Sequence, residues 1–185
     1  MNRRQYLRLW LTALDRHERR LRVTVARERN RFVKQCAESL NGTDVPSNVF
    51  AAHQKRVAGI LLAHYESVIP YFGKLATREF KRRRGMLERK RTDSAFIRMM
   101  EWASTRALAN AKSIADTDIG DVRTAIENGL AAGLGNAEIA RGVRKVSTTT
   151  PYRAATVART ETHAAATYGA IAAARTTSQE LGIKL

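Results

Sequence analysis

The sequence predicts an all-α protein, and three observations lead to this fold class. Apolar residues recur at helical spacing through most of the 185 residues, and no segment alternates polar and apolar residues as a half-buried β-strand does. Only 3 prolines interrupt the pattern, and the hydrophobic content of 44% suits a folded chain rather than a disordered one. No apolar run is long enough to span a bilayer, so we expect no membrane segment.

The first expected helix fills almost the whole segment before Asn41-Gly42, a dipeptide that commonly ends helices. It would be about 55 Å long at ~1.5 Å per residue. A chain of this size cannot cover such a helix along its whole length, so we expect the helix to project or to pack on another subunit. Its inward stripe consists of Leu7, Leu11, Leu14, Leu21, Val25, Phe32, Cys36 and Leu40.

A second helix is expected to begin at Ser47, because serine is a good N-cap. Pro70 is expected to kink or to end it, and a further helical stripe then leads into a basic run that Gly85 interrupts. Asp93 is expected to cap the next helix, whose apolar stripe reaches Ile114.

Shorter helices are expected after this point. Thr117 or Asp118 is expected to start one that ends at Gly133, and Asn136 is expected to cap the next. Each of these starts rests on a side chain that accepts hydrogen bonds from the first turn of a helix.

The last expected helix is rich in alanine. Thr150-Pro151 places an N-cap before a proline at the first helical position, which is a preferred helix opening, and the helix is expected to run to about Leu181. The chain therefore divides into a basic helical region, residues 1–114, and a compact helical module, residues 115–185, that ends in this long helix.

The net charge of +16 is unevenly distributed along the chain. Residues 1–91 carry 22 basic and 8 acidic side chains, whereas residues 92–185 carry 11 and 9. Of the 33 basic residues, 25 are arginines, whose planar guanidinium groups suit phosphate and carboxylate partners. We therefore expect the first half of the chain to contact an anionic partner.

The densest basic segment is Arg78–Arg91. It predicts sequence-independent contacts with double-stranded DNA, because it carries no base-reading motif and its aromatic residues do not alternate with the basic ones. An acidic protein surface and a solvated helix face are the alternatives. The predicted binding residues are Lys81, Arg82, Arg83, Arg84, Arg89, Lys90 and Arg91.

The arginines of the first helix also raise the possibility of membrane-surface binding. Acidic residues are interspersed among them, however, which favours ion pairs between helices and packing on a partner. Self-association through this helix is one form that such packing can take.

A polar segment, Arg159–His163, interrupts the alanine-rich helix. Arg159 and Glu161 project about 200° apart at ~3.6 residues per turn, so they cannot pair with each other. We expect them to anchor neighbouring helices through hydrogen-bonded charges, because a buried charge requires a partner. A catalytic or nucleic-acid role and a contact with a partner protein are the alternatives. The motif residues we single out are Arg159, Thr160, Glu161 and Thr162.

The order of segments in the second half is also informative. A Thr-capped helix is followed by Gly129–Gly133, by Asn136–Ala140 and, after a spacer, by Arg153–Thr162, which contains the tetrapeptide ARTE. Over about residues 115–182 this order resembles the phage Mu F-like minor head protein family, also called the head morphogenesis family.

The resemblance implies a virion structural protein at the portal vertex, which acts in capsid assembly and in DNA packaging or delivery. The implied partners are the portal protein, the major capsid protein and packaged double-stranded DNA. The implied location is the capsid interior, with the host cytoplasm as the site of assembly, and no cofactor is implied. Family members commonly continue into a segment with Trp, Asp, Arg and His or Cys, which residues 1–185 do not contain.

The sequence carries no recognisable catalytic or metal-binding motif. It lacks a phosphate-binding loop, a nucleophile elbow and the residue spacing of zinc or calcium sites. His53 and His64 lie three helical turns apart, too far to chelate one ion, and Glu161 and His163 point away from each other. We therefore predict no enzyme activity, metal or cofactor.

Two alternatives to a phage head protein remain open at this point. One is a cytosolic protein that binds or compacts DNA independently of its sequence. The other is an enzyme such as a nuclease, which would need the further C-terminal segment of the family to supply metal ligands.

Overall fold

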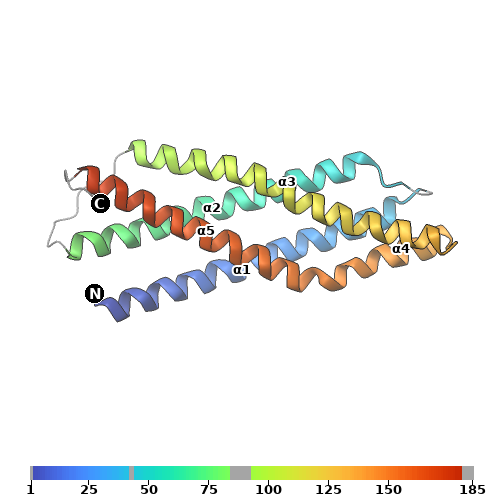
Figure 1. Cartoon of the computed structure of the whole chain (residues 1–185), viewed down its shortest axis with the longest axis horizontal. Helices are drawn as coiled ribbons and strands as arrows, with labels where there is room; N and C mark the ends of the chain where they lie inside the picture. Colours follow the sequence, from blue (N-terminus) through green and yellow to red (C-terminus); the bar gives the residue numbers. More distant parts are fainter. Residues whose placement is uncertain (1, 42–43, 84–92, 181–185) are drawn as a thin grey trace.

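The computed structural model of the chain describes residues 2–41, 44–83 and 93–180 (Figure 1). Within these ranges the protein is all-α, which confirms the predicted fold class. The elements are α1 (Arg3–Ser39), α2 (Ser47–Arg83), α3 (Asp93–Ala131), α4 (Asn136–Lys145), the 3₁₀-helix η1 (Val146–Thr149) and α5 (Thr150–Glu180).

The long helices α1, α2, α3 and α5 form an elongated bundle in which successive long helices run in opposite directions (Figure 1). α5 packs mainly on α2 and α1, while α3 packs mainly on α2 and only slightly on α5. α4 and η1 close the end of the bundle at which α1 ends and α2 begins. The N-terminus lies at the opposite end, near the end of α5.

α1 is a member of the bundle, which corrects the expectation that it projects or needs another subunit for cover. Its buried residues extend from Ala13 to Ala37, and it contacts α2, α5 and α4. Cover is possible because α2 and α5 are themselves 37 and 31 residues long. The first turns of α1 nevertheless expose Leu7, Leu9 and Leu11 by 47%, 47% and 63%.

α2 begins at Ser47, as predicted, and continues through Pro70 to Arg83. Pro70 therefore does not end the helix. A proline inside a helix removes a backbone hydrogen bond and typically costs about 3 kcal/mol. Burial of the side chains around it offsets this cost, because Val68, Ile69 and Phe72 are almost completely buried.

α3 is one uninterrupted helix, so the expected break between Ile114 and Thr117 is wrong. The Thr117 hydroxyl donates to the carbonyl oxygen of Ser113, one turn earlier, at 2.9 Å instead of capping a new helix. The Asp118 carboxylate is buried against Arg29. Both residues that resembled N-caps are thus used inside a continuing helix.

The predicted stop at Gly133 is confirmed. α3 ends at Ala131, and Gly133 has a φ of 67°, which glycine adopts without strain. The amide of Leu134 then donates to the carbonyl oxygen of Gly129 at 3.0 Å, which satisfies one of the last carbonyls of the helix. The start of α5 at Thr150 also agrees with the Thr150-Pro151 signal.

The apolar core consists of two clusters placed one after the other along the bundle. The larger contains Leu61 and Phe72, and the smaller, nearer α4, contains Phe32 and Val122. Residues from both sides of the boundary at 114/115 enter each cluster. The predicted division of the chain is therefore not a division into two cores, and it stays a prediction about sequence modules.

Gly169 marks a close approach of α5 to α2. A Cβ atom at this position would overlap the backbone carbonyl oxygen of Ile69. The buried apolar residues of α5 are all alanines, Ala154, Ala158, Ala165, Ala166 and Ala173. The slender face of α5 is what lets the two helices lie so close together.

We expect Gly169→Ala to lower the free energy of unfolding by about 1–3 kcal/mol, because the added methyl group forces α5 away from α2. Gly120→Ala is the matched control, since a Cβ atom there meets nothing within 4 Å. It should stabilise α3 by about 0.5–1 kcal/mol through helix propensity. Urea denaturation of both variants measures the difference, and equal effects would contradict the close approach of the two helices.

Candidate nucleic-acid interface and buried charge networks

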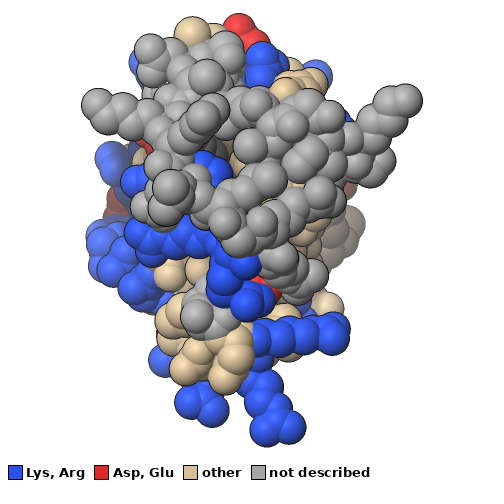
Figure 2. Space-filling model, turned by 90° about the vertical axis from the view of Figure 1, so that its left-hand side faces the viewer, with Lys and Arg blue, Asp and Glu red and all other residues tan. Residues whose placement is uncertain are grey.

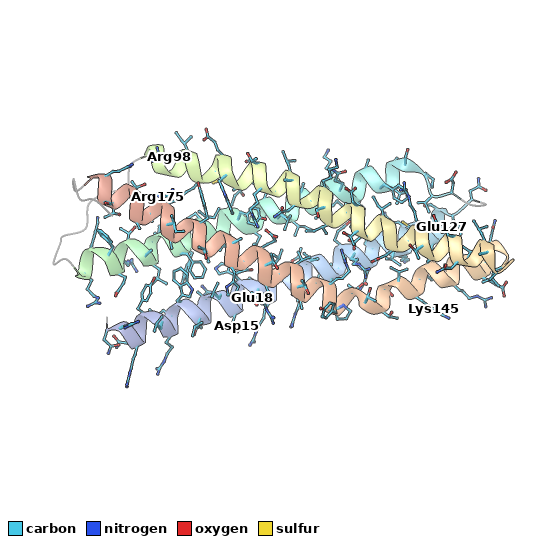
Figure 3. The ribbon with its side chains drawn as sticks, in the orientation of Figure 1. Asp15, Glu18, Arg98, Glu127, Lys145 and Arg175 are labelled. Atoms are coloured by element: carbon cyan, nitrogen blue, oxygen red, sulfur yellow. The ribbon has the colours of Figure 1, made fainter. Side chains whose placement is uncertain are left out.

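Exposed basic side chains of all four long helices meet at the end of the bundle where α1 begins. Figure 2 views this end, and much of its described surface is Lys or Arg. Figure 3 shows Arg98 of α3 and Arg175 of α5 at this same end. We call this set the cationic end; it comprises Arg3, Arg4, Arg8, Lys74, Arg78, Arg82, Arg98 and Arg175.

The described helical turns that carry the cationic end hold fewer acidic than basic side chains. Glu79 is buried and accepts two hydrogen bonds from Arg82, at 3.0 and 2.9 Å. Glu101 is exposed on α3. The opposite end is mixed in charge, with Glu127 on α3 and Lys145 at the end of α4 (Figure 3). Exposed basic side chains therefore outnumber exposed acidic ones among the described residues of this end.

Of the residues predicted to bind DNA, Lys81 and Arg82 are the ones whose side chains the structure describes, and only Arg82 is exposed. Lys81 is buried at 6% exposure, which contradicts its predicted role as a direct contact, and Arg82 is exposed but pairs with Glu79. The other predicted residues, namely the side chain of Arg83 and residues Arg84, Arg89, Lys90 and Arg91, lie outside what the structure describes. Sequence reasoning missed that the described start of the run, at Arg78 and Arg82, lies at the same end of the bundle as arginines from α1, α3 and α5.

Arg29 is the centre of a charge network inside the bundle. Its side chain is 2% exposed, and its Nε donates to Asp118 at 2.8 Å. One terminal nitrogen donates to Asp121 at 2.7 Å. The other donates to the Val146 carbonyl at 3.0 Å and to the Thr150 hydroxyl at 2.8 Å. One side chain of α1 thereby holds α3, η1 and the first residue of α5.

The sequence contained a signal for this residue. Arg29 falls on the same helical stripe as Val25, Phe32 and Cys36, at spacings of four, three and seven residues. A charge on an apolar stripe must be paired when the stripe is buried. Arg29 was instead predicted to be one of the surface arginines of the first helix, and this prediction is wrong.

His53 extends the network to α2. Its Nδ1 lies 3.0 Å from Glu28 and its Nε2 3.2 Å from Asp118, and its ring stacks on Phe32 with centroids 4.0 Å apart. Burial alone lowers the pKa of His53, but the hydrogen bonds with Asp118 and Glu28 outweigh it, so the pKa is raised. The protonated ring is therefore the favoured form, donating to both carboxylates.

The two carboxylates are stabilised in the charged form by the same contacts. Burial raises the pKa of Asp118. The hydrogen bonds with His53 and Arg29 lower this pKa by a larger amount, so the net shift is downward. Glu28 behaves likewise, with His53 and Arg56 as its partners, the latter at 2.7 Å. The network therefore consists of mutually compensating charges, as buried ions require.

Glu161 anchors a second polar network, between α5, α2 and α3. It accepts hydrogen bonds from the Tyr65 hydroxyl at 2.5 Å, from Asn110 at 2.8 Å and from Arg106 at 3.1 Å. Burial and then the hydrogen bond to Glu161 raise the pKa of Tyr65. The prediction that Glu161 anchors neighbouring helices is thus confirmed at this residue.

The rest of the motif divides between the inside and the surface. The buried Thr162 hydroxyl lies 3.0 Å from Nε2 of His64. Thr160 and Arg159 are exposed, and Arg159 lines a cleft of ≈ 380 Å³ between α1 and α5 without anchoring a helix through an ion pair in the described chain. The anchoring role predicted for Arg159 is therefore wrong. It fails because residue 159 faces outward when Glu161, about 200° away, faces inward.

In the described part of the chain, His53 lies within hydrogen-bonding distance of both Glu28 and Asp118. The histidine, cysteine, aspartate and glutamate side chains of this part form no group of three or more that could hold a metal ion. Burial raises the pKa of the Cys36 thiol to about 12, which leaves it protonated and a poor nucleophile. No helix in the described ranges combines the length and the apolarity of a membrane span.

Comparison with known proteins gives no match: no family model, no curated protein and no solved structure matches this chain. The resemblance to the phage minor head proteins therefore stays a prediction from the residues themselves.

We expect Arg29→Met to lower the free energy of unfolding by about 3–5 kcal/mol, because it leaves Asp118 and Asp121 without their guanidinium partner. Arg31→Met is the matched control on the same helix, since Arg31 is exposed. It should change stability by less than about 0.5 kcal/mol. Urea denaturation tests both, and similar losses in the two variants would contradict the central position of Arg29.

His53 should make stability depend on pH above neutrality. Because its pKa is raised in the fold, its contribution is fully present below the ordinary value of 6.5 and is lost as pH rises through the raised value. Thermal denaturation should therefore show Tm falling as the pH rises above about 6.5, and His53→Gln should flatten this fall while lowering Tm throughout. An unchanged slope in His53→Gln would rule out His53 as its source.

Proposed function

We propose that the protein is a non-enzymatic structural protein of phage heads, of the minor head protein type, and that its cationic end contacts packaged double-stranded DNA. The observation that carries the proposal is the separation of roles within the molecule. The ARTE segment supplies Glu161 to an internal network, as a structural motif does, while arginines of four helices converge at one end. Neither feature requires chemistry on a substrate.

Sequence-independent binding follows from the residue types at the cationic end. Arginine forks bind phosphate oxygens, and each phosphate neutralised releases counterions from the DNA. Among the described residues this end is formed by the termini of helices, and none of these helices lies exposed along its length there as an element that reads bases in the major groove would. Contacts with the phosphate backbone are what this geometry supports.

The start of α1 supports a second kind of contact. Leu7 and Leu11 are one helical turn apart and are 47% and 63% exposed, beside the arginines of the cationic end. Exposed leucines on a short stretch of helix favour contact with another protein. We assign this stretch to the portal protein, the major capsid protein or a second copy of the chain, within the capsid interior or during assembly in the host cytoplasm.

We expect Arg3→Gln/Arg4→Gln/Arg8→Gln to weaken binding to a random-sequence DNA duplex and to reduce the log–log salt slope by about 2–3, at ~0.9 for each phosphate that is no longer neutralised. Arg123→Gln/Arg144→Gln/Lys145→Gln is the control, because it removes three exposed charges near the opposite end. Fluorescence anisotropy across a salt titration measures both. Equal weakening in the two variants would show that net charge alone, and not the cationic end, governs binding.

Copurification separates the phage head proposal from its main alternative, a cytosolic DNA-compacting protein, which the cationic end also supports. The tagged chain, isolated from nuclease-treated cells that assemble phage heads, should remain with portal-containing particles. Release of the chain by the nuclease, with no capsid or portal protein retained, would favour the DNA-compacting protein instead.

A further inference from the structure

A cleft of ≈ 590 Å³ lies between α3 and α5 at the cationic end. α3 packs only slightly on α5, which leaves space between the two helices. α5 lines the cleft with one face, on which Tyr168, Ile171 and Arg175 recur at spacings of three and four residues. Arg98 lines it from α3. The volume falls within the range of small-molecule sites, roughly 300–1,000 Å³.

Two guanidinium groups from different helices line this cleft. Arg98 and Arg175 are both exposed, and neither side chain forms an ion pair or a hydrogen bond with another described residue. Among the described residues of the lining none is acidic, and Glu101, one turn after Arg98, is exposed outside the cleft. The described lining therefore carries two positive charges that no carboxylate of the lining neutralises.

Tyr168 joins the two helices beside these arginines. Its ring stacks on Trp102 of α3, with centroids 4.1 Å and planes 7° apart, and its hydroxyl donates to the carbonyl oxygen of Arg98 at 3.3 Å. Burial raises the pKa of Tyr168. The charges of Arg98 and, less strongly, Arg175 oppose this rise, to which Glu101 adds. Both guanidinium charges thus act on one hydroxyl oxygen, so both lie near the same wall of the cleft.

This pair of charges fits a phosphate monoester better than a phosphodiester of the DNA backbone. A phosphate monoester carries a charge of about −1.5 to −2 at pH 7 and three strong acceptor oxygens. A backbone phosphodiester carries a single negative charge. Two guanidinium groups balance the charge of the monoester, and each can present two parallel N–H donors to its oxygens. The chemistry of the cleft therefore favours a phosphate at the end of a chain.

We propose that the cleft between α3 and α5 binds the terminal phosphate of a DNA strand, between the guanidinium groups of Arg98 and Arg175. The nucleoside next to this phosphate lies along Ile171, which is 46% exposed, and Ala172. A terminal phosphate enters a cleft with a strand on one side of it, whereas a backbone phosphate needs room for a strand on both sides. This site rests on the proposed function, because the other arginines of the cationic end bring the DNA to the cleft.

A DNA hairpin with a single duplex end tests this site. The hairpin with a 5′-terminal phosphate should bind the full chain at least about fivefold more tightly than the same hairpin with a 5′-hydroxyl, as measured by fluorescence anisotropy at one salt concentration. Equal affinity of the two hairpins would overturn the terminal-phosphate site and leave the proposed DNA contact intact. Failure of both hairpins to bind would refute the DNA contact itself. A phosphoserine peptide that binds more tightly than either hairpin would show that the phosphate belongs to a protein, and would also overturn the site.

Single substitutions locate the phosphate. Arg98→Gln and Arg175→Gln should each abolish the preference for the phosphorylated hairpin. Arg8→Gln is the matched control, because it removes an exposed arginine of the cationic end that does not line the cleft. It should weaken the binding of both hairpins alike and keep the preference. Tm should stay unchanged in all three variants, since the replaced side chains are exposed. A preference that survives in Arg98→Gln or Arg175→Gln, or that disappears in Arg8→Gln, would show that the phosphate binds elsewhere.

Discussion

The buried guanidinium of Arg29 is the interaction on which the arrangement of the helices depends. It lies between the two apolar clusters and bonds to α3, η1 and α5 at once, while His53 carries the same network across to α2. Removing such charges from water is costly, and apolar residues of similar volume often stabilise a protein as much. Apolar residues would not supply direction, whereas Arg29 donates four hydrogen bonds to acceptors at fixed places. The network therefore fixes positions more than it adds stability.

α5 needs such fixed points more than the other helices do. Its buried apolar residues are alanines, and Gly169 faces α2 as well, so α5 offers no large apolar side chain that locks into a matching space on α2. Apolar packing of small residues changes little when one helix slides along another. The bonds from Glu161 and Thr162 in the middle, and from Thr150 at the start, set its position along the bundle. This accounts for a polar segment within a helix that its alanines alone would form.

The sequence predicts the elements better than their partners, and the reasons are physical. Helix periodicity and caps are local properties, so the starts at Ser47 and Thr150 and the stop at Gly133 could be read directly. The break predicted at Thr117 is wrong because capping residue types also occur inside helices. Thr117 bonds there to the carbonyl oxygen of Ser113, and Asp118 pairs with Arg29. The partners of Glu161 lie 51 to 96 residues away in the sequence, and no spacing rule reaches that far. The sequence showed Arg29 as a charge on an apolar stripe. It did not show which residues accept the hydrogen bonds of Arg29.

The inner networks also shape the outer surface. Glu28, Glu79, Asp118 and Glu161 are buried, whereas Arg29 and Lys81 are the buried Arg and Lys side chains among the described residues. Burial therefore withdraws more acidic than basic side chains from the surface, and the solvent-facing charge is more basic than the composition suggests. At the cationic end exposed basic side chains of four helices lie together, and like charges repel one another. A bound polyanion relieves that repulsion, so binding and the stability of this end are linked: whatever neutralises the cationic end also tightens it.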